Sequence, residues 1–241
     1  ALRQLAKNRW QADPVKGPLT LSYQVYAYDL SVRGAYLDSE RGFFNGTSVF
    51  LAAEGYENDA CSVDIHAPEG KSYAEWKVAT SLPAADVKKK SGFGRYQASS
   101  YDELIDHPVE LGDFHKVSFK ACGVPHEFVV SGRFQGDLKR LADDTRKICE
   151  YQIGMFGKPA PFDRYVFMLF VGKDIYGGLE HRASTALVAN RDDLPAPGAT
   201  EISDGYLKLL GLISHEYFHS WNVKRMKPAV FAPYDLNQEG H

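Results

Sequence analysis

The sequence predicts an α+β protein, in which an N-terminal antiparallel β-domain of the sandwich or saddle type precedes a second, helix-containing domain. Short apolar runs of strand length, separated by turn residues, fill the first half of the chain. A long helical pattern of apolar residues begins only after Phe134. We therefore expect two domains, residues 1–133 and residues 134–241.

The predicted strands of the first domain are short and regularly spaced. From residue 19 to 28 apolar and polar residues alternate with period two, which is typical of a half-buried strand. A turn at Gly123-Val124-Pro125 predicts that the last two strands form a hairpin. The other predicted strands are 48–52, 61–66, 76–80, 116–121 and 126–131.

The second half predicts two helices around one buried strand. A helix is expected from Asp137 to about Gly157, where a glycine followed by a proline supplies the stop. The apolar run 165–171 is too short for such a helix and predicts a buried strand. The final helix is expected to begin near Ser203 and to continue towards Lys227.

Composition and charge exclude several classes of partner. The net charge of −3 and the absence of a long Lys/Arg cluster argue against nucleic-acid binding. No apolar stretch approaches the roughly 18 residues that a membrane-spanning helix needs. Three widely spaced cysteines without a C-x-x-C pair argue against a disulfide framework and a cysteine metal site. We expect a cytoplasmic location, with a periplasmic one left open; the oligomeric state is not predicted.

The strongest chemical signal is the sequence His215-Glu216-Tyr217-Phe218-His219 on the final predicted helix. Histidines four residues apart project from one face on successive turns, so both can bind one Zn²⁺. A glutamate directly after the first histidine can serve as the general base for a zinc-activated water. The alternative, two ordinary histidines beside an exposed glutamate, is disfavoured because the motif is rare by chance.

Two histidines do not complete such a site, because catalytic zinc takes three protein ligands. The only acid after Asp235 is Glu239, which lies in a terminal Glu-Gly-His stretch that looks like part of a purification tag. We therefore expect the third ligand to lie beyond Gln238. The chain as given is expected to be a poor or inactive enzyme.

A second candidate element is Gly177-Gly178-Leu179-Glu180, which follows the predicted buried strand. Paired glycines let a substrate backbone approach closely, and the Glu180 carboxylate could hold the free ammonium of a peptide. Taken alone, the same stretch is more typical of a plain turn.

These motifs together resemble the glycyl aminopeptidase family of zinc metallopeptidases, which are aminopeptidase N-like gluzincins whose members usually carry a PDZ domain further along the chain. The similarity is strongest in the helix and its continuation, His-Glu-Tyr-Phe-His-Ser-Trp-Asn-Val-Lys-Arg. It includes the Gly-Gly-Leu-Glu-His stretch and residues 101–104 and 108–112.

The resemblance implies an N-terminal β-domain followed by the first part of a thermolysin-like catalytic domain. It implies that His215 and His219 bind zinc, that Glu216 is the general base, and that Glu180 matches the acid that holds the substrate α-amino group. The last match departs from the family box at His181, where aminopeptidase N has asparagine. The family's third ligand, stabilising tyrosine and PDZ domain would follow Gln238.

The leading hypothesis is therefore a zinc aminopeptidase that acts on peptides with a free N-terminus, with Gly and Ala favoured by the resemblance. An endopeptidase, in which the Gly-Gly segment pairs with a substrate backbone, is one alternative. A non-catalytic peptide-binding module is the other, with its clustered aromatic residues lining a recognition face. For those aromatic residues, packing in the core is the favoured interpretation. They are Tyr23, Tyr26, Tyr28, Phe43 and Phe44.

Overall fold

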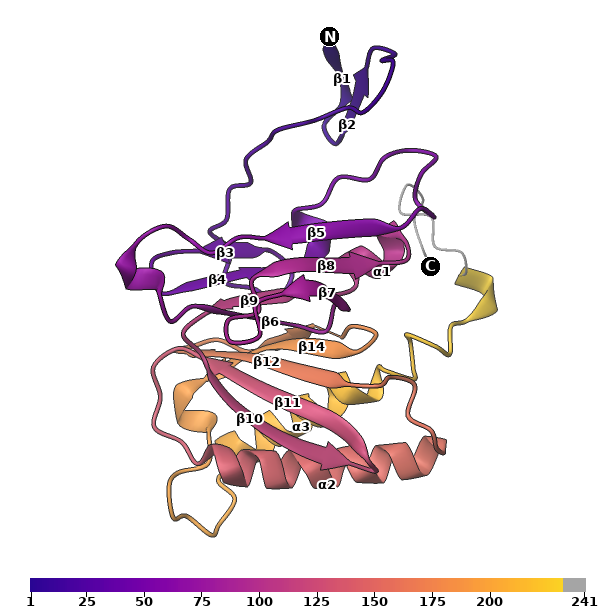
Figure 1. Ribbon diagram of the computed structural model, residues 1–241. Coiled ribbons are helices and arrows are strands. Elements are labelled where there is room, and N and C mark those ends of the chain that lie inside the picture. The colour runs from indigo at the N-terminus through magenta and orange to yellow at the C-terminus, as the bar shows by residue number, and fades with distance from the viewer. Residues whose placement is uncertain (232–241) are drawn as a thin grey trace.

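The computed structural model describes residues 1–231 and has the expected α+β architecture, with small antiparallel sheets followed by a larger sheet and two long helices (Figure 1). The terminal Glu239 and the expected tag and third-ligand positions lie outside the described residues. Among residues 1–231, no helix combines the length and apolar character needed to cross a membrane.

The first part of the chain consists of three antiparallel sheets and one short helix. A hairpin of β1 (Leu2–Ala6) and β2 (Arg9–Ala12) stands apart at the N-terminal end (Figure 1). A four-stranded sheet has the order β3 (Ala35–Leu37), β4 (Arg41–Phe44), β9 (Val109–Gly112) and β6 (Lys77–Thr80). A three-stranded sheet has the order β5 (Cys61–Ile65), β8 (Gly94–Ala98) and β7 (Ala84–Val87), and α1 (Tyr101–Ile105) leads from it into β9.

The second part is built on a mixed five-stranded sheet. Its order is β10 (His115–Ala121), β11 (Val124–Ser131), β12 (Tyr165–Gly172), β14 (Ser184–Asn190) and β13 (Gly177–Glu180). The three central strands are parallel, whereas β10 and β13 are antiparallel edges. A central parallel strand is covered on both faces, which explains the unbroken apolar run of β12.

Helices α2 (Leu138–Phe156) and α3 (Asp204–Phe218) cover one face of this sheet, and the first part of the chain covers the other (Figure 1). The main core lies between the sheet and the helices and includes Leu141 and Ile153 of α2 and Leu209 and Ile213 of α3. On the opposite face, a smaller cluster joins Phe43 of β4 to β14. The first part of the chain therefore packs against the face of the five-stranded sheet that α2 and α3 leave uncovered.

A buried ion pair fastens the four-stranded sheet to the five-stranded one. The Arg41 guanidinium donates two hydrogen bonds to the Glu110 carboxylate, each of 2.7 Å. The Ser131 hydroxyl of β11 donates to the same carboxylate at 2.5 Å, and the guanidinium lies over the Phe170 ring of β12. Both charged side chains are buried, so each charge is stabilised by the other rather than by water.

Most predicted elements are confirmed, but two predicted strands are wrong. The structure has strands that overlap the predicted ranges 61–66, 76–80, 116–121, 126–131 and 165–171, and α2 is capped by the Asp137 side chain. Residues 48–52 instead begin with the last residue of the 3-10 helix η1 (Gly46–Ser48), and the amides of Val49 and Phe50 bond back to the Gly46 carbonyl. Those local hydrogen bonds replace a strand ladder.

The predicted strand 19–28 is extended but, among the described residues, pairs with a neighbour only at its end. Tyr28 forms a single bridge with Tyr36, and the side chain of Tyr26 is 89% exposed. Alternation makes a segment suitable for a sheet, but a strand also needs an adjacent edge. The favoured interpretation of core packing is therefore correct for Phe43, which is buried, but wrong for the three tyrosines of the group, all of which are exposed.

The sheets change earlier than the expected boundary near residue 133. Strands β10 and β11 form the predicted hairpin, but β11 pairs in parallel with β12 and so belongs to the five-stranded sheet. The apolar pattern of a hairpin does not reveal which remote strand it will pair with. The division into domains itself stays a prediction, and the sheet pairing favours placing it near residue 114.

Candidate active site

Helix α3 ends sooner than predicted, and its end shapes the site. The Ser203 side chain caps the first turn by accepting from the Tyr206 amide at 3.2 Å. The last helical residue is Phe218, and His219 forms the C-cap with αR backbone angles. Residues 220–225 continue as turns rather than as the helix that was expected to reach Lys227. His215 is therefore on the last helical turn and His219 at its boundary.

The two imidazoles converge on one point beside this helix end. Their Nε2 atoms lie 3.1 Å apart. The Nδ1 of His219 donates to the Asn222 carbonyl at 2.6 Å, which leaves the Nε2 lone pair available for a ligand. Two nitrogens bound to a tetrahedral zinc at roughly 2.0–2.1 Å are about 3.3 Å apart. The spacing of the two rings and the tautomer of His219 therefore fit a zinc ion.

Glu216 lies three residues before His219, on the same side of the helix end, in a largely buried position. Its exposed fraction is 4%, and its Oε2 has no hydrogen-bond partner among the described residues. Burial and then the neighbouring Glu180 carboxylate raise its pKa to about 7, while His219 and Arg33 act in the opposite direction. A buried carboxylate with a free oxygen and a pKa near neutrality can accept a proton and release it again.

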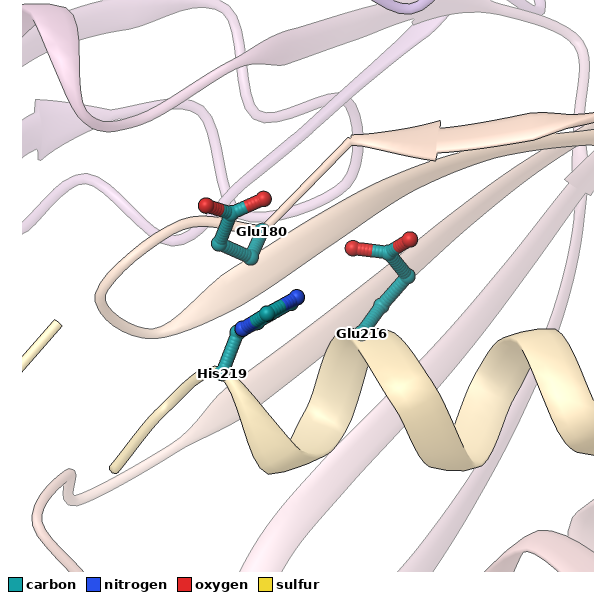
Figure 2. A group of neighbouring side chains, drawn as sticks. All are labelled: Glu180, Glu216 and His219. Atoms are coloured by element: carbon teal, nitrogen blue, oxygen red, sulfur yellow. The ribbon is translucent and has the colours of Figure 1, made fainter. Parts of the chain in front are cut away.

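Edge strand β13 brings Glu180 to this helix end. Ligand atoms of Glu180, Glu216 and His219 all lie within 4.8 Å of one another and form a group that could hold a metal ion. Figure 2 shows the three side chains pointing into the same space, Glu180 from the strand and the other two from the helix. This convergence links residues that are remote in the sequence.

Glycine at position 178 allows the strand and the helix to approach this closely. A Cβ added there would lie 2.5 Å from both Cγ and Cδ of Glu216. A Cβ on Gly177 would instead make an ordinary 3.7 Å contact with Val188. The two glycines are therefore not equivalent, and only Gly178 faces the Glu216 carboxylate.

The structure thus brings together five of the six residues singled out from the sequence, namely His215, Glu216, His219, Glu180 and Gly178. Gly177 is on the same strand but does not face them. Sequence reasoning missed Asn222, whose carbonyl orients His219, and Arg33, whose charge acts on Glu216. Asn222 could have been identified from the sequence, because it lies in the family-like stretch that follows the histidine motif.

Comparisons with known proteins agree with this geometry. Residues 1–113 match the Peptidase M61 N-terminal domain, and residues 208–241 match the M61 glycyl aminopeptidase family. A solved structure of an aminopeptidase N family protein from Idiomarina loihiensis has a TM-score of 0.94 and 47% sequence identity. That match covers 99% of this chain but 40% of the other. No curated protein matches the sequence.

The family models cover both the β-rich first part and the helix with the histidine motif, and together they span more than half of the chain. A peptidase family suggests a metal cofactor, which agrees with the group formed by Glu180, Glu216 and His219. The chain therefore belongs to the M61 glycyl aminopeptidase family.

Proposed function

We propose that this chain carries the catalytic centre of a zinc-dependent aminopeptidase, which removes N-terminal residues from peptides and favours Gly or Ala. The observation that carries the proposal is the convergence of Glu180 of β13 with Glu216 and His219 within 4.8 Å. A hydrolytic centre needs a proton acceptor beside the metal ligands, and an exopeptidase needs in addition a group that binds the free amine. The two carboxylates supply both.

In this proposal His215 and His219, whose Nε2 atoms lie 3.1 Å apart, would hold zinc, and a third ligand would come from residues that the structure does not describe. When bound, zinc supplies Lewis-acid chemistry that lets water act as a nucleophile near neutral pH. Glu216 accepts the proton of the attacking water at Oε2, its oxygen without a partner, and passes it to the leaving amine.

Glu180 and the strand that carries it position the peptide. The carboxylate accepts hydrogen bonds from the substrate α-ammonium, and the ionic contact fixes the chain end next to the scissile bond. Among the described residues β13 pairs only with β14, so its outer edge is free to bond to an extended peptide. Gly178 adds no side chain between the strand and Glu216.

Replacing Glu180 in the full-length protein tests the proposal. Glu180→Gln keeps the size of the side chain but removes its charge, and it should raise KM for glycyl p-nitroanilide by about tenfold or more, because a charge-assisted hydrogen bond is weakened. Bound zinc should be unchanged, and Glu216→Gln should retain zinc while losing kcat. The exposed Glu201→Gln is the matched control.

Two results would contradict these roles. An unchanged KM in Glu180→Gln would remove the amine-binding role. Loss of zinc in the same variant would instead make Glu180 a metal ligand, which its place in the Glu-Glu-His group also allows.

The free edge of β13 also suits an endopeptidase, because backbone pairing does not require a free amine. Peptides with an acetylated N-terminus discriminate between the two functions. An aminopeptidase leaves them intact, whereas an endopeptidase cleaves them at internal bonds.

A further inference from the structure

Helix α1 presents Asp106 from a firmly held position in the first part of the chain. The Ser100 side chain caps the helix by accepting from the Glu103 amide at 3.1 Å, and the Glu103 carboxylate accepts from the Ser99 amide at 2.6 Å. Gly46 packs directly on the helix, since a Cβ there would lie 2.6 Å from Cα of Ile105. Asp106 is the C-cap of this helix, so its backbone has little freedom.

The Asp106 carboxylate accepts hydrogen bonds from three cationic or ring donors. Its Oδ1 accepts from Nδ1 of His181 at 3.2 Å and from Nζ of Lys224 at 2.8 Å, and its Oδ2 accepts from Nε of Arg182 at 3.0 Å. Burial alone would raise the pKa of Asp106, but the His181 hydrogen bond and the Lys224 charge hold it well below its usual range. The carboxylate is therefore ionised, and both of its oxygens accept hydrogen bonds.

The three partners belong to the two segments that build the candidate active site. His181 and Arg182 directly follow Glu180 at the end of β13. Lys224 lies in the turns after His219, close to Asn222, whose carbonyl orients the His219 ring. One carboxylate from the first part of the chain thus connects the strand that carries Glu180 to the segment that carries His219.

A second contact reinforces the same connection. The Arg225 guanidinium donates to the Arg182 carbonyl at 2.8 Å, to the Ser220 carbonyl at 2.8 Å and to the Pro161 carbonyl at 2.7 Å. Edge strand β13 has a sheet neighbour on one side only, so these side-chain bonds add to the ladder that pairs the end of the strand with β14. The hydrogen bond from His181 to Asp106 gives His181, which departs from the aminopeptidase N box, a structural role.

We propose that Asp106 is a positioning residue for the amine-binding carboxylate: by holding His181, Arg182 and Lys224 together, it sets where Glu180 stands relative to Glu216 and His219. This inference rests on the proposed function of Glu180. Asp106 is not part of the group formed by Glu180, Glu216 and His219, and it acts through the residues that it holds. Recognition of the free amine by the second part of the chain therefore depends on a residue of the first part.

The inference differs from a purely structural role in what it predicts for ligands. If Asp106 only stabilised the fold, its loss would lower the melting temperature and affect all ligands of the site alike. If it positions Glu180, its loss should weaken ligands that carry an α-amine and spare ligands that bind without one. A displacement of about 1 Å is enough to weaken a catalytic contact by up to about 100-fold.

The experiment compares two inhibitors of the full-length zinc-loaded enzyme. Glycine hydroxamate has the α-amine, and acetohydroxamate is the same chelator without it, so the ratio of their inhibition constants reports amine recognition. We expect Asp106→Asn to reduce this ratio by about tenfold or more and to raise KM for glycyl p-nitroanilide more than it lowers kcat. Bound zinc, measured by atomic absorption, should stay at the wild-type level.

Asp102→Asn is the matched control. Asp102 pairs with the same Arg182 at 2.7 Å, but its side chain is 84% exposed and reaches neither His181 nor Lys224. This variant should keep the wild-type inhibitor ratio. Lys224→Met removes one of the three hydrogen bonds to Asp106. If Asp106→Asn does not fold, Lys224→Met takes its place and should reduce the inhibitor ratio in the same way.

The outcomes separate this inference from the proposed function. If Glu180→Gln loses the amine preference but Asp106→Asn keeps the wild-type ratio, the positioning role is refuted and the function of Glu180 stands. If Glu180→Gln itself keeps the ratio, both are refuted. A loss of the amine preference in Asp106→Asn and Glu180→Gln, with Asp102→Asn unchanged, supports the inference.

Discussion

The buried His126 gives a quantitative test of how the five-stranded sheet supports the helix that carries the site. Its Nδ1 donates to the Val124 carbonyl at 2.9 Å, and its Nε2 accepts from the Tyr217 hydroxyl of α3 at 2.9 Å. Burial lowers the pKa of His126 to about 4, although the hydrogen bond to Val124 acts in the opposite direction. Protonation would place an unpaired charge in the core and remove the acceptor for Tyr217.

The sign and size of the effect follow from the two pKa values. A histidine in the unfolded chain has a pKa of about 6.5. Because the folded-state pKa is lower, the unfolded chain binds the proton more readily. His126 therefore contributes stability that is present above about pH 6.5 and is lost as the pH falls towards 4. From this residue alone, the free energy of unfolding should fall by about 2 kcal/mol between about pH 7.5 and about pH 5.0.

Urea unfolding at the two pH values, followed by circular dichroism, measures this change. His126→Asn should be less stable than wild type at both pH values because the hydrogen bonds are perturbed, but it should lose about 2 kcal/mol less on acidification. The exposed His66→Gln is the control and should behave as wild type.

Other buried histidines do not obscure the comparison. Burial also lowers the pKa of His107, to about 4, and lowers that of His181, so both add to the acid sensitivity of the wild-type protein. They remain in His126→Asn and cancel in the difference. Equal losses of stability in wild type and His126→Asn would refute the assignment of this share to His126.

Three further changes test other features of the structure. Glu110→Gln leaves a buried guanidinium without its counter-ion and should lower the free energy of unfolding by about 3–5 kcal/mol, measured in urea. Glu40→Gln, which removes an exposed ion pair, should cost less than about 1 kcal/mol. Gly178→Val should displace Glu216 and lower kcat by about 100-fold with zinc retained. Gly177→Ala should change kcat little. Equal effects of the two variants on kcat would contradict the assigned geometry. His219→Ala in the full-length protein should lose bound zinc on dialysis, as atomic absorption would show; retained zinc would exclude this residue as a ligand.

Local sequence patterns determined the elements that depend on neighbouring residues. The spacing of His215 and His219 places their rings on one face wherever the segment is helical, and the tertiary structure does not change that relation. The apolar run of β12 and the capping residue of α2 are local signals of the same kind. For these elements, the periodicity of the backbone alone fixes which side chains share a face.

Only the tertiary structure decided which remote segments meet. Strand pairing depends on the edge that is available, so the sequence did not reveal that β11 joins β12 or that residues 19–28 have little to pair with among the described residues. Packing between sheets and helices likewise brings Glu180 close to Glu216. It also lets Asp106 form hydrogen bonds with both segments of the site. The sequence alone therefore determined the helix with the histidine motif. The folded chain determined which residues surround it, because those contacts join segments that are remote in the sequence and no local pattern predicts their pairing.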